Sequence, residues 1–227
     1  MGLPFAGSRV VVFDAYGTLF DVASAAERAG DALGSRWRPL AETWRAKQLQ
    51  YTWLRSLMGR HADFWQVTGD ALDFSLASLG IDDPRLRRRL MDLYERLDAY
   101  PEAREVLATL RSRGLQLAIL SNGAPAMLEA AARSAGLADL LHAVLSVESV
   151  GVYKPAPQVY ALATGHFQVA PAEITFVSAN GWDAHGASAF GFRVAWCNRA
   201  GQPAERLPGR PDAVIRSLAE LPALLGG

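Results

Sequence analysis

The chain has 227 residues, more than an average single domain needs, which fits a core domain that carries an insertion. Lys plus Arg and Asp plus Glu both number 23, so no basic excess exists to attract nucleic acid or an anionic membrane surface. The single Cys197 excludes an internal disulfide, and its strand-like surroundings indicate an inert buried thiol. We expect neither a signal peptide nor a membrane span, and therefore a cytoplasmic protein.

The first feature that indicates chemistry is the apolar run from Val10 to Phe13 and the charged residue that follows it. Uninterrupted β-branched and aromatic residues are typical of a strand buried on both faces of a parallel sheet. Asp14 would then lie at the carboxyl end of that strand, the edge at which open α/β sheets bind ligands. Gly17 allows the backbone to turn, and Thr18 offers a hydroxyl beside the carboxylate. An isolated aspartate at a strand end more often caps a turn, so its meaning depends on the rest of the chain.

The segment 21–99 shows no convincing strand, and its apolar residues recur at helical intervals. Within 41–60, one predicted stripe contains Trp44, Gln48, Tyr51, Arg55 and Met58, and a neighbouring face carries Trp53, Leu54 and Leu57. We therefore predict a helical cap subdomain at 21–99, inserted into a core formed by 1–20 and 100–227.

After Pro101 the pattern changes to strands that alternate with helices. The predicted elements are a helix at 102–112, a strand at 115–120, a helix at 124–135, a strand at 143–146, a helix at 157–166, a strand at 174–177, a helix at 183–190, a strand at 193–197 and a strand–helix pair within 213–225. This alternation implies right-handed crossovers and a mostly parallel sheet. The expected fold class is α/β, a Rossmann-like doubly wound parallel sheet with the helical cap inserted.

Three further segments place polar groups after predicted strands. Ser121-Asn122-Gly123 precedes a helix start, where unpaired N–H groups and the helix dipole favour an anion. Lys154 stands between prolines and glycine in an extended loop. The segment 178–183 delivers a hydroxyl, an amide and a carboxylate within six residues. Each alone would be read as a helix cap or a solvated loop residue.

Asp14, Ser-Asn-Gly, Lys-Pro and a terminal polar cluster, each after its own strand and in this order, resemble the four motifs of the haloacid dehalogenase superfamily. The resemblance covers nearly the whole chain. In the superfamily's phosphatases a second aspartate follows the nucleophile by two residues and acts as general acid, but this chain has Tyr16 there. Those enzymes also carry an acidic magnesium ligand where Asn180 stands, and Mg²⁺ prefers anionic oxygens. The pattern is similar instead to the L-2-haloacid dehalogenases, which need no metal or other cofactor.

This resemblance implies that Asp14 attacks the halogen-bearing carbon and forms an aspartyl ester. Lys154 would keep Asp14 ionised, and Tyr160 matches a residue that positions this lysine. Arg45, which matches the family's halide-contacting arginine, would hold the departing halide together with Asn122.

Hydrolysis of the ester would follow, by a water that Asp183 orients or deprotonates. Asp183 would be assisted by Ser178, Asn180 and Thr18. The substrate carboxylate would be held by Ser121 and by backbone N–H groups of Ala15, Tyr16 and Asn122. The apolar substrate wall would consist of Leu49, Phe64 and Trp182.

Two other functions stay open at this point: a phosphatase or phosphonatase of the same superfamily, and a catalytically silent member that only binds. The expected partners are small halogenated carboxylic acids and a second copy of the chain. His185 falls near the fourth motif, where a solvent-facing or capping role is expected.

Overall fold

The computed structural model describes residues 3–95 and 97–226. Its centre is a six-stranded sheet, parallel at every strand pair, with the strand order β3-β2-β1-β4-β5-β6. The strands are β1 (Val10–Phe13), β2 (Gln116–Ser121), β3 (Ala143–Ser146), β4 (Ile174–Ser178), β5 (Arg193–Cys197) and β6 (Ala213–Ile215). The expected α/β fold with a doubly wound parallel sheet is therefore confirmed.

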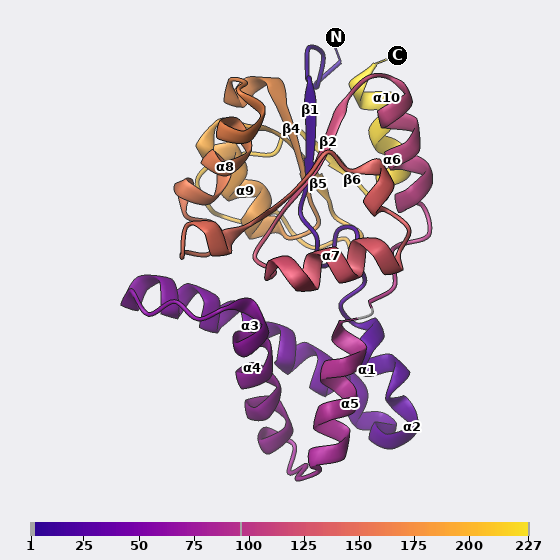
Figure 1. The fold of residues 1–227 in the computed structure, drawn as a ribbon, viewed down its shortest axis with the longest axis vertical. Helices are drawn as coiled ribbons and strands as arrows, with labels where there is room; N and C mark the ends of the chain where they lie inside the picture. The colour runs from indigo at the N-terminus through magenta and orange to yellow at the C-terminus, as the bar shows by residue number, and fades with distance from the viewer. Residues whose placement is uncertain (1–2, 96, 227) are drawn as a thin grey trace.

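Helices cover both faces of this sheet, with α8 and α9 on one side and α6 and α10 on the other (Figure 1). The helices of this part are α6 (Ala103–Ser112), α7 (Pro125–Ser134), α8 (Pro157–Phe167), α9 (Gly181–Phe190) and α10 (Leu221–Leu225). Short 3₁₀ turns lie between them: η2 (Ala138–Leu140), η3 (Val147–Ser149), η4 (Pro171–Glu173) and η5 (Leu218–Glu220). Helix α9 begins two residues before its predicted start, so Trp182 and Asp183 lie in its first turn.

The innermost strand carries Asp14 to the middle of the sheet's carboxyl edge. All four residues of β1 are fully buried, because β2 and β4 flank the strand and helices cover both faces of the sheet. The Asp14 N–H continues the ladder by donating to the Val177 carbonyl at 2.9 Å. At β1 the strand order reverses direction, and such a switch point leaves a crevice outside the carboxyl ends.

The helices between β1 and α6 gather below these carboxyl ends (Figure 1). They are α1 (Ser24–Arg28), α2 (Gly30–Leu33), η1 (Gly34–Arg36), α3 (Trp37–Met58), α4 (Phe64–Ser78) and α5 (Pro84–Tyr94). The two connecting segments meet where Phe20 forms an antiparallel bridge with Ala99. Division of the chain at residues 20 and 100 stays a prediction.

Helix α3 buries a narrower stripe than the sequence predicts. Its buried residues follow one another at intervals of four: Leu40, Trp44, Gln48 and Thr52. Met58, which was placed in the stripe, is 70% exposed, and the neighbouring Leu57 is 85% exposed. The C-terminal end of α3 projects past the start of α4 (Figure 1), and Arg55 in its last turn pairs with Asp70 of α4 at 2.8 Å.

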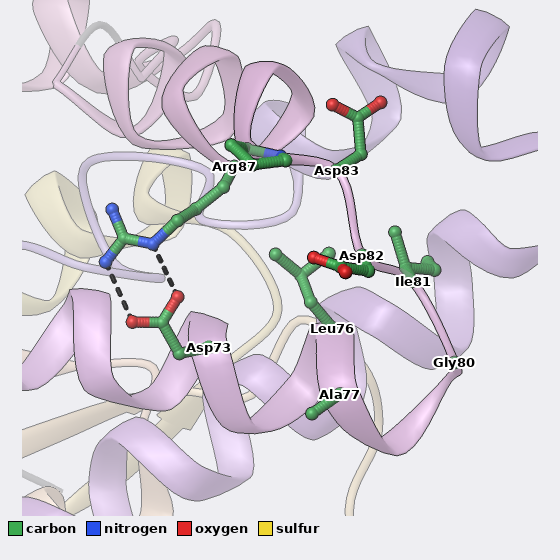
Figure 2. A pocket seen from close by; sticks show the side chains of 9 residues that line it. Asp73, Leu76, Ala77, Gly80, Ile81, Asp82, Asp83 and Arg87 are labelled. Carbon is green, nitrogen blue, oxygen red and sulfur yellow. Dashed lines mark hydrogen bonds and ion pairs between the residues drawn. The ribbon is translucent and has the colours of Figure 1, made fainter.

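A surface pocket of about 460 Å³ lies at the turn between α4 and α5, at the end of the insertion away from the sheet (Figures 1 and 2). Three of its four charged side chains, those of Asp73, Asp83 and Arg87, are already engaged. Arg87 binds Asp73 through two hydrogen bonds, at 2.5 and 2.9 Å, and Asp83 caps α5 by accepting from the Arg85 and Leu86 N–H groups. Within the described residues, no helix is both long and apolar enough to cross a membrane.

Candidate active site

The carboxylate of Asp14 is buried and held by side chains from three parts of the chain. Its Oδ2 accepts hydrogen bonds from Thr18 Oγ1 at 3.1 Å, Asn180 Nδ2 at 2.8 Å and Ser178 Oγ at 3.4 Å. Its Oδ1 accepts from Lys154 Nζ at 3.1 Å. Donors on both oxygens fix the orientation of the carboxylate and compensate for its removal from water.

Lys154 lies between two buried carboxylates. Its Nζ is 3.1 Å from Asp14 Oδ1 and 2.9 Å from Asp183 Oδ2, and its side chain is 1% exposed. Burial alone would lower the pKa of Lys154, but the attraction of the two carboxylates outweighs it and raises this pKa above its ordinary value. The ammonium group therefore stays charged and joins the two acids.

Asp183 is fully buried and receives a second donor from α8. The Tyr160 hydroxyl donates to Asp183 Oδ1 at 2.7 Å. Burial raises the pKa of Asp183, and the nearby Lys154 opposes this rise. Burial also raises the pKa of Tyr160 far above its ordinary value, so its hydroxyl stays protonated as a donor. Tyr160 thus reaches Lys154 through Asp183.

The polar residues after β2 lie beside the Lys154 loop. Asn122 Oδ1 accepts from the Lys154 backbone N–H at 3.0 Å, which fixes the loop that carries the lysine. Ser121 is fully buried, and its Oγ accepts from the Gly123 N–H at 3.1 Å. A side chain at Gly123 would meet the Tyr16 ring and Leu128 at 2.8 Å, so this turn requires glycine.

Arg45 reaches the same edge from the helical insertion. Its Nη2 donates to Asn180 Oδ1 at 3.2 Å and lies 3.4 Å from the Tyr16 carbonyl oxygen, while its Nη1 donates to Gln48 Oε1 at 2.8 Å. All three partners are uncharged. The positive charge of Arg45 is therefore directed at the Asp14 cluster without a carboxylate bound to it.

Aromatic rings line the site beside Asp14. Tyr16 is 3% exposed and stacks on Phe64, with ring centroids 5.4 Å apart. The Tyr16 hydroxyl is buried and makes no hydrogen bond within the described chain. Its pKa lies well above the ordinary value, because burial and the neighbouring Tyr94 and Asp14 disfavour the phenolate more than Arg45 favours it. A phenol in this state is a poor proton donor at neutral pH.

The other two residues of the predicted apolar wall are Trp182, which contacts α3, and Leu49, which belongs to α3. Trp182 packs edge-on against Trp53, with ring centroids 5.4 Å apart. Leu49 lines a pocket of about 770 Å³ together with Trp44, Arg45 and Tyr94. Arg45 thus lines this pocket and also contacts Asn180, which binds Asp14.

Sequence reasoning missed the polar partners inside the insertion. Gln48 binds Arg45, and Tyr94 binds Gln48; the only signal in the sequence was a glutamine within an apolar stripe. The expectation for His185 was wrong. This side chain is 5% exposed, and its Nδ1 lies 3.2 Å from the Leu207 carbonyl oxygen because the loop after β5 covers it.

The donor set does not fit the Mg²⁺ site of the phosphatases. The Asn180 amide nitrogen donates to Asp14 Oδ2 at 2.8 Å and to the Tyr16 carbonyl oxygen at 3.1 Å, so an N–H donor binds these two oxygens. Lys154 already joins Asp14 to Asp183. Within residues 3–95 and 97–226, no three His, Cys, Asp or Glu side chains gather as metal ligands.

Comparison with known proteins agrees with this geometry. A haloacid dehalogenase-like hydrolase family model matches residues 8–191. The (S)-2-haloacid dehalogenase 1 of Pseudomonas sp. (strain CBS-3) is 45% identical over 96% of both chains. The (S)-2-haloacid dehalogenase of Pseudomonas sp. (strain YL) is 47% identical over 92% of this chain and 90% of its own. The L-2-haloacid dehalogenase of Xanthobacter autotrophicus, solved with chloropropionic acid covalently bound, superposes with a TM-score of 0.89 at 43% identity and covers 96% of this chain and 98% of its own.

Lys154→Met should destabilise the protein by about 3–5 kcal/mol at pH 7, since two buried carboxylates would lose their shared cation. Burial already raises the folded-state pKa of Asp183, and losing Lys154 would raise it further. Protonation of Asp183 would then favour the folded state of the variant. The difference in free energy of unfolding between variant and wild type should therefore shrink as the pH falls from about 7 to about 5. Urea unfolding at both pH values measures this.

Lys47, the only other lysine, provides the control. Its Nζ donates to Gln50 at the surface, so Lys47→Met should cost less than about 1 kcal/mol at either pH. An equal loss in both variants would contradict the assigned role of the buried cation.

Proposed function

Because this chain belongs to the haloacid dehalogenase-like hydrolases, we propose that it converts L-2-haloacids to D-2-hydroxy acids, and haloacetates to glycolate. The observation that carries the proposal is the Asp14 carboxylate, bound by Lys154 and by neutral donors, with Tyr16 in place of a general acid. Halide leaves carbon without a proton, so the absence of that acid suits this reaction. The covalent chloropropionic acid adduct of the Xanthobacter relative supports the same route.

In the first step an oxygen of Asp14 attacks the halogen-bearing carbon from behind. The new bond is the O–C bond of an aspartyl ester, the carbon–halogen bond breaks, and halide leaves with its electron pair. Attack in line requires alignment, which could supply about 7–11 kcal/mol of the reduction in barrier. Thr18, Asn180 and Ser178 provide it by fixing the carboxylate plane.

In the second step water attacks the carbonyl carbon of the ester. The bond between the acyl carbon and the ester oxygen breaks, so the hydroxy acid leaves with the oxygen that Asp14 gave it in the first step. One proton of the water passes by way of Asp183 to that oxygen and forms the hydroxyl group. The water oxygen stays on Asp14, which becomes a carboxylate again as the second proton leaves to solvent. Asp183 accepts two donors, Lys154 and Tyr160, which hold it ready to orient the water. Three side chains assist this step by donating to Asp14 Oδ2, the oxygen that Lys154 does not bind: those of Ser178, Asn180 and Thr18.

We assign substrate binding to the groups that surround this cluster. Ser121 and the N–H groups of Ala15, Tyr16 and Asn122 would hold the substrate carboxylate at the end of β2 and β1. The Asn122 amide oxygen is engaged by the Lys154 N–H, which leaves its amino group to donate to the halide together with Arg45. The apolar part of the acid would face Leu49, Phe64 and Trp182.

The two alternative functions receive no support from a particular contact. Phosphoryl transfer would need a general acid where Tyr16 stands and an anionic ligand where Asn180 stands. A silent binding protein would have no use for the Asp14–Lys154–Asp183 arrangement. The homodimer, which exposed Leu57 and Met58 on α3 favour, and the cytoplasmic location stay predictions.

Incubation with racemic 2-chloropropionate should consume only the L enantiomer and yield D-lactate, since one displacement inverts the centre and ester hydrolysis leaves it untouched. Prolonged treatment with a chelator should not change the rate. Chiral chromatography of substrate and product measures the outcome. L-lactate as product, or activity that chelation removes and Mg²⁺ restores, would contradict the proposed route.

A single turnover in ¹⁸O-labelled water should place the label in Asp14 before any appears in the hydroxy acid. The reason is that water attacks the carbonyl carbon of the ester rather than the substrate. Mass spectrometry of the Asp14 peptide follows the label. Asp14→Ala should fold normally and turn over nothing; label in the first product molecule would mean that water attacks the substrate directly.

Arg45→Ala should lower kcat on the order of 100-fold with little loss of stability, because its charge would act on the halogen as it departs. The loss should be larger for L-2-chloropropionate than for L-2-bromopropionate, since chloride has the stronger bond and the more concentrated charge. Steady-state kinetics with both acids provides the comparison. An equal loss on both would make Arg45 a general anchor instead.

A further inference from the structure

We infer that Gln48 is a positioning residue that holds Arg45 ready for the departing halide, and that Thr68 and Tyr94 hold Gln48 in turn. This inference rests on the function proposed above. Gln48 lies three residues after Arg45 on α3, so both side chains emerge on the same side of the helix. Gln48 Oε1 accepts from Arg45 Nη1 at 2.8 Å.

The orientation of the Gln48 amide is fixed by its neighbours. Thr68 Oγ1 donates its proton to the Phe64 carbonyl at 2.6 Å, so toward Gln48 it can only accept. Gln48 Nε2 donates to it at 2.7 Å and to the Tyr94 hydroxyl at 3.0 Å. The amide oxygen must therefore face Arg45.

Packing alone does not explain a glutamine at this position. Gln48 is 1% exposed within the stripe that α3 buries, where an apolar side chain would avoid the cost of desolvation. The chain instead uses both polar ends of the amide, with partners on α3, α4 and α5. Such a network fixes the direction in which each donor points.

The neutrality of Gln48 also distinguishes Arg45 from other arginines of the insertion. Arg55, Arg87 and Arg89 each pair with an aspartate, at 2.8, 2.5 and 2.9 Å respectively. A glutamate at position 48 would bind Arg45 in the same way and cancel its charge. An amide orients the guanidinium but leaves its charge available for an anion.

Hydrogen bonds hold both terminal nitrogens of the Arg45 guanidinium group. Nη1 is held by Gln48 of the insertion, and Nη2 is held by Asn180 after β4. The arginine therefore needs little reorganisation when charge develops on the halogen, which is how fixed donors accelerate a reaction. Without Gln48, the Nη1 end would be released and the long side chain would regain part of its rotamer freedom.

The test compares wild type with Gln48→Leu, Gln48→Glu and Tyr94→Phe. Thr52→Val is the matched control, because Thr52 is buried one turn further along the same stripe and its hydroxyl donates to the Leu49 carbonyl of the same helix. We expect Gln48→Leu to lower kcat on the order of 10-fold to 100-fold, with a larger loss on the chloro-acid than on the bromo-acid. Gln48→Glu should lose at least as much, and Tyr94→Phe less. Thr52→Val should keep the ratio of the two rates.

Two further measurements separate positioning from stability and from the proposed function. In an Arg45→Ala background, Gln48→Leu should cause no further loss of kcat, since it acts through the arginine. Calorimetric titration with bromide should show weaker binding in Gln48→Leu than in wild type and Thr52→Val. An unchanged rate ratio with unchanged bromide affinity, or a fully additive loss in the double variant, would overturn the inference. If Gln48→Leu binds bromide more weakly than wild type but wild type turns over no haloacid, the proposed function would be overturned and the inference about Gln48 would stand.

Discussion

The structure depends on one buried cation that holds two carboxylates together. Lys154 joins Asp14 at the end of β1 to Asp183 in the first turn of α9, where water cannot stabilise any of the three charges. Such an arrangement persists only when further hydrogen bonds satisfy the remaining lone pairs. Asn180 and Tyr160 supply them, so parts of the chain more than one hundred residues apart must meet with little error. The register of β1 and β4 meets this requirement, because it places Phe13 opposite Val177 and so brings the residues that follow the two strands side by side.

The helical insertion adds a second cation, Arg45, whose hydrogen-bond partners are uncharged. Asp14, Asp183, Lys154 and Arg45 carry charges that cancel in sum, but Lys154 contacts both acids and Arg45 contacts neither. Arg45 is bound by neutral groups, among them Gln48 and Asn180. The site is therefore neutral overall and still presents one unneutralised positive charge to an incoming anion.

Side-chain amides carry much of the geometry. Asn180 accepts from Arg45 and donates to Asp14, and Asn122 accepts from the backbone of Lys154. Amides do not titrate, so the amide side of each contact keeps the same donors and acceptors at every pH. They also orient charged groups without neutralising them, which a reaction between two anions requires.

The sequence by itself determined the strands, their parallel arrangement and the residues that follow each strand, because apolar runs and turn residues act locally. β3 and β5 begin and end where predicted. Asp14 directly follows β1, Ser121 is the last residue of β2, and Asn180 comes two residues after the end of β4. Only the tertiary structure decided which residues of α3 are buried, since that depends on which elements pack against it. It also decided that Gln48 meets Arg45 and that a loop covers His185. Those contacts join segments distant in the chain, and no local pattern records them.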